Sequence, residues 1–407
     1  MLKNSFNKLI TFNIFMFFNV MVFLAKIIYN FYNDFSTDYF EDWSIASNLV
    51  KYGVYAEFID VGSTAYKLPI YPLFLSLFIY LFPKNASDVI IVIQHFFYFI
   101  IPLIIIFISR ILNKEKIGII TSYLFIFSPA YFFYSNVIEA TNIFIPILLV
   151  WVFFYLQIYK EFYTNNFHYI IFSLITALLF LTQVVIVPVA IILIIYLLIS
   201  KKIIFKKFIF IVFFLSFFYS PWVIRNYIVF NKFIPTKTPV WQNIFLSFTE
   251  SVNVIDEVKI IPRRLELQVL GKRAQLPELE MESIYKQKTL KAIEGKEEVF
   301  FLKAIQNIAL LWYVPPRYFY DHSMKIVFGR KIFVLLLNFF TIISLFYLFK
   351  SNRKLFYLSI LFFINFTLPY SVGHAANTRF KLDFEWYQYF LVSYLIYYYS
   401  KRNHLIT

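Results

Sequence analysis

Long apolar stretches alternate along most of the chain with short connectors that are rich in lysine and arginine. A run of about 17–25 apolar residues is long enough to cross a bilayer as an α-helix. The pattern therefore predicts an all-α, polytopic membrane protein of about ten transmembrane helices. The predicted spans are 9–29, 90–108, 117–133, 141–159, 169–181, 184–199, 208–223, 332–349, 355–370 and 386–399.

Two further apolar stretches do not fit the pattern of a span. The stretch 69–82 is short and begins with a proline, and 299–313 is interrupted by Lys303 and Gln306. We predict that both form extracytoplasmic juxtamembrane helices that lie at the membrane surface. Counting 69–82 as a span would invert every later connector and place the basic ones on both sides.

The connectors define two long outer loops, 30–86 and 226–331, within a single transmembrane domain that covers 1–407. We expect the first loop to be catalytic. The second loop is mixed in charge, and its pattern predicts one small amphipathic helix at 278–292. No internal repeat and no separate soluble domain is evident.

The distribution of charge predicts which side of the membrane each connector faces. The chain carries a net charge of +15, yet only 15% of its residues are charged and 60% are hydrophobic. Much of the positive charge lies in the short connectors, as in the cytoplasmic loops of membrane proteins, so it does not indicate a nucleic-acid partner. We predict a multi-pass protein of the cell (inner) membrane with both termini cytoplasmic. The first outer loop carries acids on the opposite face, namely Asp34, Asp38, Glu41, Asp42, Glu57 and Asp60.

Candidate chemistry is concentrated in the first outer loop. The absence of cysteine excludes thiolate chemistry, and no nucleotide-binding or metalloprotease motif is present. Asp38 and Asp42 open a helical stretch that ends at Gly53, where they can act as plain helix caps. Lys67 precedes a proline-opened helix, where an interfacial lysine is also common. Together, a carboxylate that accepts a proton and a lysine that neutralises a phosphate suit glycosyl transfer from a lipid phosphate.

A second outer acid, Glu139, lies just before a predicted span. A carboxylate so close to hydrocarbon is costly unless it is paired or faces a cavity. The alternative is a loop carboxylate in water, and we favour a functional role.

With these residues in place, the chain resembles the GT-C class of membrane glycosyltransferases, more narrowly the relatives of protein O-mannosyltransferases and of the lipid A aminoarabinose transferase. Five segments carry the resemblance in order along most of the chain. They are Asp38 with Ala46 and Gly53; Lys67-Leu-Pro-Ile-Tyr-Pro72; Ser128-Pro129 followed by Glu139; Ser220-Pro-Trp-Val-Ile-Arg225-Asn-Tyr227 with Phe230, Thr238 and Asn243; and Thr378-Arg379-Phe-Lys-Leu382.

The resemblance implies an inverting transfer of a sugar from a polyprenyl-phosphate donor at the extracytoplasmic surface. Asp38 would be the general base and Lys67 a contact to the donor phosphate. Glu139 would orient the acceptor or, as in some members, hold a divalent metal ion, with Asp38 as a second ligand. Arg225 and Arg379 would contact the donor phosphate, and pairing with lipid headgroups or carboxylates is an equal alternative for both.

The sequence departs from the family pattern at several positions. Glu139 stands where relatives often have Asp, and Gln183 stands where many bacterial members have Arg. Leu68 and Ile70 replace more regular residues in the lysine-proline motif. Asp42 occupies a position that is usually aromatic, so Asp38 and Asp42 can share or exchange roles. These differences leave the envelope acceptor, which can be a lipid, a glycan or a protein, open.

Two other functions remain as alternatives. A flippase for lipid-linked saccharides would usually carry paired half-repeats and acids in mid-membrane, whereas here glycine is scarce and the acids are in loops. A polysaccharide polymerase would share the many spans and the large outer loop, but we would expect arginine-rich outer loops.

Overall fold

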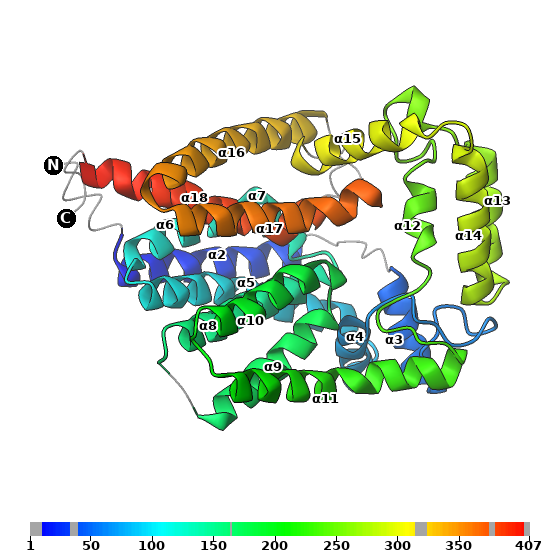
Figure 1. Cartoon of the computed structure of the whole chain (residues 1–407), viewed down its shortest axis with the longest axis horizontal. Helices are drawn as coiled ribbons and strands as arrows, with labels where there is room; N and C mark the ends of the chain where they lie inside the picture. The colour runs from blue at the N-terminus through cyan, green and yellow to red at the C-terminus, as the bar shows by residue number, and fades with distance from the viewer. Residues whose placement is uncertain (1–9, 33–39, 163–164, 314–323, 374–378, 403–407) are drawn as a thin grey trace.

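The computed structural model describes residues 10–32, 40–162, 165–313, 324–373 and 379–402. Over these ranges the chain is almost entirely helical, and the only β pairing is an isolated bridge between Thr249 and Ile261. The all-α prediction is therefore confirmed. Figure 1 shows most of the helices running lengthwise in one bundle, with a group of shorter helices across one end.

By length and composition, six of the described helices are able to cross a membrane. The protein is therefore a multi-pass membrane protein. All six correspond to predicted spans, and α8 has the predicted bounds. The six are α2 (Phe12–Tyr32), α5 (Ala86–Ile111), α8 (Thr141–Tyr159), α11 (Phe205–Phe230), α16 (Met324–Ser351) and α17 (Arg353–Val372).

The other four predicted spans are shorter, broken or more polar than the six. The stretch 117–133 is divided because Ser128 is extended and Pro129 begins a new helix at its first turn, a position that proline favours. Residues 184–199 begin with one 3₁₀ turn before the α-helix. The elements are α6 (Glu115–Ile126), α7 (Pro129–Tyr134), α9 (Asn166–Phe180), α10 (Val187–Ile199) and α18 (Arg379–Arg402).

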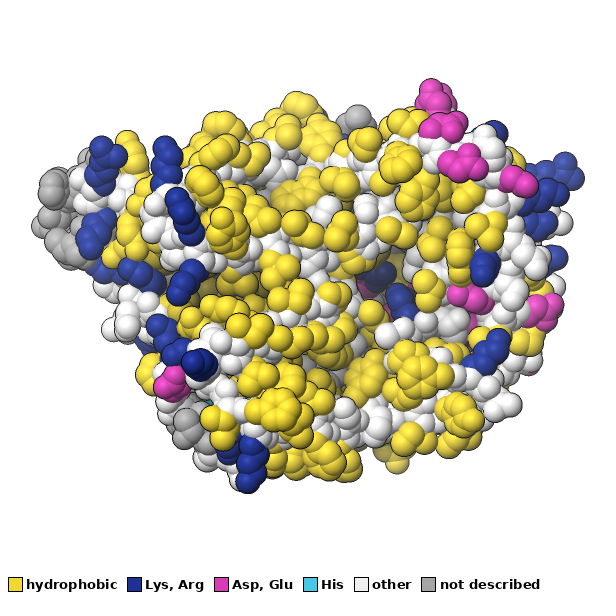
Figure 2. Space-filling model, viewed as in Figure 1, with side chains coloured by type: hydrophobic (Ala, Val, Ile, Leu, Met, Phe, Trp, Pro, Cys, Tyr) yellow, Lys and Arg dark blue, Asp and Glu magenta, His cyan; other side chains and the backbone are white. Residues whose placement is uncertain are grey.

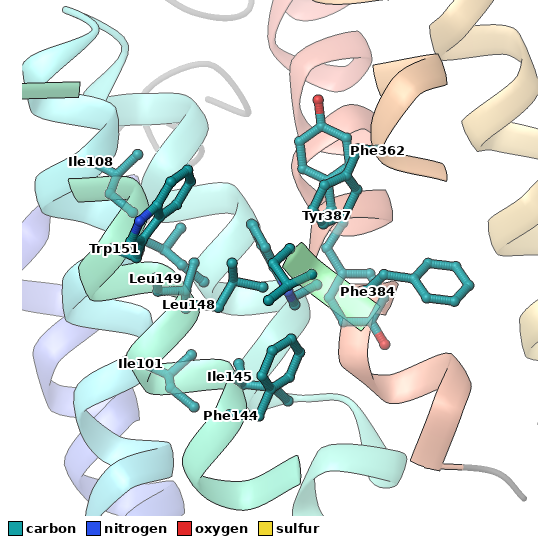
Figure 3. Close-up of a cluster of buried hydrophobic side chains, with 14 of the residues drawn as sticks. Ile101, Ile108, Phe144, Ile145, Leu148, Leu149, Trp151, Phe362, Phe384 and Tyr387 are labelled. Atoms are coloured by element: carbon teal, nitrogen blue, oxygen red, sulfur yellow. The ribbon is translucent and has the colours of Figure 1, made fainter. Parts of the chain in front are cut away.

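The bundle core lies where α5 and α8 face α17 and α18. In Figure 3, Ile101 of α5 and Leu148 of α8 lie on one side, and Phe362 of α17 and Phe384 of α18 lie on the other. These side chains belong to one large buried cluster that links most of the lengthwise helices. Because the spans bury apolar residues on one face and expose apolar residues on the other, the core continues into a lipid-compatible outer surface.

Helix α18 begins seven residues before the predicted start at 386 because its first turns bury charge inside the protein. Glu385 accepts hydrogen bonds from the Arg330 guanidinium, at 2.9 Å from Nη1. Asp383 accepts from Thr141 Oγ1 at 2.9 Å and from Gln183 Nε2 at 3.0 Å. Hydropathy registers these residues as polar, although protein partners satisfy them without water.

The two stretches predicted to lie at the surface form short helices, α4 (Ile70–Leu81) and α15 (Glu298–Tyr313). The second outer loop holds more structure than the one predicted helix. It forms α12 (Trp241–Leu246), α13 (Arg263–Gly271) and α14 (Glu278–Ile293), and the last of these matches the predicted helix. Their apolar faces pack into a separate small core around Phe245, Phe248 and Tyr285. We call residues 241–293 the cap.

Charge is distributed unevenly along the bundle. Helix α2 begins and α18 ends at the end opposite the cap (Figure 1), and lysine and arginine side chains gather over that basic end (Figure 2). Two ion pairs of the connectors lie there, Arg110–Glu115 at 2.6 Å and Lys202–Glu161 at 2.7 Å. Most of the acidic side chains visible in Figure 2 lie on the cap end.

Candidate functional site

The candidate site begins with the helix of the first outer loop, α3 (Glu41–Tyr52). Glu41 and Asp42 occupy its first turn, where the helix dipole favours negative charge. The helix ends at Gly53, whose φ of 69° lies in the left-handed region that suits glycine. The predicted helical stretch and its end at Gly53 are both confirmed. Asp38, the predicted general base, lies outside the described residues.

Lys67 joins both acids of the first turn. Its Nζ lies 3.3 Å from Glu41 Oε2 and 3.4 Å from Asp42 Oδ2, and only 17% of the lysine side chain and 4% of the Asp42 side chain are exposed. Burial alone lowers the pKa of Lys67, but Asp42 and Glu41 outweigh it and raise the pKa. The lysine is therefore a fixed positive charge at neutral pH. The structure thus brings Asp42 and Lys67 together.

Glu41, which the sequence analysis did not single out, links the first loop to the cap. Burial raises its pKa, but Lys67 and Arg273 overcome that effect and lower it to about 2. Arg273 Nη1 lies 3.6 Å from Glu41 Oε1, and Arg273 Nη2 also bonds Glu57. The guanidinium lies 4.1 Å from the centre of the Tyr66 ring. Glu41 is thus held ionised between two cations and is a weak base.

The cap contacts the first loop a second time through Glu278. Its carboxylate accepts from the Thr64 hydroxyl and, at 3.1 Å, from the Ala65 amide. Burial nevertheless raises the pKa of Glu278 to about 7. With Glu57 and Arg273, Glu278 lines a small open cleft between the first loop and the cap.

Glu139 lies between α7 and α8 and is buried. Its Oε1 lies 3.1 Å from Arg379 Nη1, and its other oxygen accepts from the Tyr134 hydroxyl. Lys26 of α2 supports this turn, because its Nζ donates to the Tyr131 carbonyl within α7 and to Ser135 Oγ just after it, both at 2.9 Å. The structure thus pairs two of the residues predicted for the site, Glu139 and Arg379.

Lys237 is the residue that sequence reasoning missed. The amide of the next residue, Thr238, donates to the Ala65 carbonyl at 3.2 Å, which brings Lys237 to the segment that carries Lys67. Burial lowers the pKa of Lys237 to about 8, and the charges of Lys67 and Arg379 lower it in the same direction. Among the described residues, no ion pair or side-chain hydrogen bond is made by its Nζ. Its only sequence signal is its position in the segment after the Pro-Trp-x-x-Arg-Asn motif.

The three cations and the first-turn acids form one charged cluster, because each acts electrostatically on the pKa of another member. Figure 2 shows a hollow between the cap and the end of the bundle, with basic side chains and an acidic one on its floor. The members of this cluster, which we call the cation cluster, are Lys67, Lys237, Arg379, Glu41 and Asp42.

Arg225 lies in the last turns of α11. It donates to backbone carbonyls and not to a side chain of the cation cluster. Its Nη1 donates to the Thr64 carbonyl at 2.7 Å and its Nη2 to the Tyr55 carbonyl at 3.3 Å. Trp222 Nε1 donates to the Thr236 carbonyl at 2.7 Å. Through these hydrogen bonds, the Pro-Trp-x-x-Arg-Asn segment anchors the backbone of the two segments that carry Lys67 and Lys237.

The family resemblance leaves open a metal site formed by Asp38 and Glu139. Both oxygens of Glu139 accept from protein donors, Tyr134 and Arg379, which compete with a cation for the carboxylate. Within the described ranges, no group of three or more acidic, histidine or cysteine side chains is arranged to hold a metal ion. The described part of the predicted metal site does not fit a metal, and Asp38 falls outside it.

The charge pattern of the cluster suits an anionic ligand with a polar head. Lys67 is paired with Glu41 and Asp42, and Arg379 is paired with Glu139. Lys237 is the member whose ammonium has no partner among the described side chains. A scan against protein-family models gave no match, and no curated protein matched the sequence.

Proposed function

We propose that the protein is an inverting glycosyltransferase that moves a sugar from a polyprenyl-phosphate donor to an envelope acceptor at the extracytoplasmic membrane surface. The observation that carries the proposal is the cation cluster, in which Lys67 lies 3.4 Å from Asp42 and the hydrogen bond from Thr238 to Ala65 brings Lys237 to the same segment. The charge of Arg379 reaches both lysines and acts to lower their pKa values. A departing lipid phosphate is the kind of anion that such a cluster stabilises. The resemblance to GT-C glycosyltransferases supports the same reaction class.

The proposed reaction needs one base and one anion site. A carboxylate of the first outer loop takes the proton of an acceptor hydroxyl, whose oxygen then attacks the anomeric carbon of the donor sugar. The bond from that carbon to the phosphate oxygen breaks, and the phosphate leaves with the electron pair toward the cation cluster. Attack from the side opposite the phosphate inverts the anomeric centre.

The base is assigned to Asp38, with Asp42 able to share or exchange its role. Asp42 is nearly fully buried and is already 3.4 Å from Lys67, so the described geometry favours it as the partner that fixes the lysine. Glu41 is a poor candidate because its pKa is lowered to about 2. Glu139, paired with Arg379, would place that guanidinium at the anion site rather than accept the proton.

The proposed topology has about ten membrane passes with both termini in the cytoplasm. In it, α9, α10, α18 and the broken pair α6–α7 cross the membrane together with the six long apolar helices. The gathering of lysine and arginine at the end opposite the cap supports this orientation, because basic connectors favour the cytoplasmic side. The cation cluster then faces outward.

The test uses purified protein in proteoliposomes with radiolabelled polyprenyl-phosphate hexose and cell-envelope fractions as acceptors. We expect label transfer by the wild type, loss of transfer in Asp38→Asn, and at least a tenfold reduction in Lys67→Ala. Lys84→Ala is the matched control, since Lys84 is an exposed lysine of the same loop and has no ion pair with any described side chain. Translocation of intact sugar phosphate without transfer would favour a flippase. Extension of lipid-linked saccharides would favour a polymerase.

A further inference from the structure

Helix α15 has its polar and apolar faces reversed relative to a helix that lies between protein and water. Lys303 is completely buried, and Gln306 and Asn307 are nearly so. On the opposite face, Phe301 is 71% and Ile305 is 64% exposed. Leu302 and Ile308 are exposed beside them. A helix in water turns its charged and amide side chains outward, so this arrangement needs a different outer medium.

The buried polar groups of α15 are satisfied inside the protein. Lys303 Nζ donates to the Val372 carbonyl at 2.6 Å and lies 4.2 Å from the centre of the Phe300 ring. Asn307 donates to the Gly373 carbonyl at 2.6 Å. Gln306 accepts from the Ile255 amide at 2.9 Å. The inward face therefore fixes the cap and the end of α17 to α15, and the outward face presents only hydrocarbon.

The outward face of α15 continues the apolar surface of α16. Phe328, Ile332, Leu335, Leu336 and Phe339 of α16 are all exposed, although they belong to a helix long and apolar enough to cross a membrane. In Figure 2 the hydrophobic surface of α16 continues over α15, and charged side chains appear where the cap begins and at the opposite, basic end. Such an extended apolar area on a membrane protein is in contact with lipid.

We propose that the outward face of α15 is embedded among lipid acyl chains beside α16, instead of lying on the membrane surface as the sequence predicts. The charged residues at its start, Glu297 and Glu298, are exposed and mark the aqueous boundary. From Glu298 to Ile308 the helix rises about 15 Å, so its far end reaches the hydrocarbon of the outer leaflet. The cap therefore lies directly against the membrane surface.

The absence of cysteine makes the proposal testable by single labels on the whole chain. Ile305→Cys and Phe301→Cys place a nitroxide on the outward face of α15, one turn apart. Phe339→Cys on α16 is the lipid reference, and Lys288→Cys on the exposed face of α14 is the water reference. In proteoliposomes, collision with dissolved oxygen and with a water-soluble nickel chelate reports the medium around each label.

We expect the oxygen-to-nickel collision ratio at Ile305 to be close to that at Phe339 and several-fold above that at Lys288. A ratio at both Ile305 and Phe301 equal to that at Lys288 would overturn the proposal. Both α15 labels point outward, and a single gel-filtration peak for each variant confirms that it is folded. The readout needs no enzymatic activity, so its outcome is independent of the proposed glycosyl transfer.

Discussion

The two ends of the bundle hold ion pairs of opposite character. At the basic end, Arg110 and Glu115 lie 2.6 Å apart, and both side chains are exposed. At the cap end, Lys67 and Asp42 lie 3.4 Å apart, and both are largely buried. The Arg110–Glu115 pair is shorter but contributes less to the free energy of unfolding. Water and salt screen it, and its long side chains lose entropy in forming it.

The difference in burial indicates which charged side chains can be removed with little loss of stability. An exposed pair contributes about 0–1 kcal/mol, whereas removing one member of a buried pair leaves an uncompensated charge that costs about 3–5 kcal/mol. Replacing such a pair with apolar residues is often neutral or stabilising, so stability alone does not account for its presence. This energetic argument supports the proposed role of the cation cluster in ligand binding.

The largest expected effect comes from removing Lys67. Lys67→Ala leaves Asp42 buried without its cation, so we expect a loss of about 3 kcal/mol in the free energy of unfolding. Lys202→Ala, which breaks a solvent-screened pair at the basic end, is the matched variant, and we expect it to lower the free energy of unfolding much less. Thermal unfolding of both in the same detergent measures the difference. Equal shifts in the two variants would contradict the comparison between the ends.

The next effect is on donor binding through Lys237. A hydrogen bond from a charged group contributes about 1.5–3 kcal/mol, so Lys237→Ala should weaken the affinity for a polyprenyl-phosphate sugar about 10–100-fold. Its unfolding temperature should change little because the ammonium has no partner among the described side chains. Lys232→Ala, an exposed lysine five residues earlier, is the control. Equal affinity in the Lys237 and Lys232 variants would remove Lys237 from the site.

A pH dependence follows from the same lysine. Because burial and neighbouring cations lower the pKa of Lys237 to about 8, the side chain is charged below pH 8 and neutral above it. Donor affinity should therefore fall as the pH rises through about 8. Lys237→Arg stays charged at every pH tested, so this step should disappear. Binding titrations from pH 6 to 10 measure it, and an unchanged step in the arginine variant would assign it to another group.

The last prediction concerns the contact between cap and first loop. The pKa of Glu278 is raised to about 7, above its usual value of 4.5, so the folded protein favours the protonated carboxyl. The stability that this preference contributes is present below about pH 4.5 and is lost as the pH rises to about 7. Glu278→Gln should flatten the dependence of the unfolding temperature on pH between 5 and 8. The same slope in the variant and the wild type would exclude Glu278 as its source.

Local patterns in the sequence predict much of the fold. The bounds of α8, the end of α3 at Gly53 and the helix α14 all follow from hydropathy or from end signals close in sequence. The stretch 117–133 fails as one helix because Ser128-Pro129 begins a second one. The start of α18 was placed too late because its charged first turns are buried against protein, which hydropathy does not distinguish from exposure to water.

Less of the site is predictable, because its members converge from distant segments. Local motifs single out Asp42, Lys67, Glu139 and Arg379 as candidates, whereas Lys237 has little local signal. Glu41 was noted only as one of several loop acids, although it contacts both Lys67 and Arg273. These relations depend on how α11 and the cap return to the first loop, which no single segment encodes.

Arg225 holds the first loop through backbone carbonyls, so the side chains of that loop can vary in sequence. Arg225 bonds the carbonyls of Tyr55 and Thr64, which every residue type possesses, and Trp222 does the same at Thr236. Side chains along these segments can therefore be exchanged in evolution or by design without loosening their anchors. A library that varies residues 58–63 would alter the wall of the cleft while the lysines keep their positions.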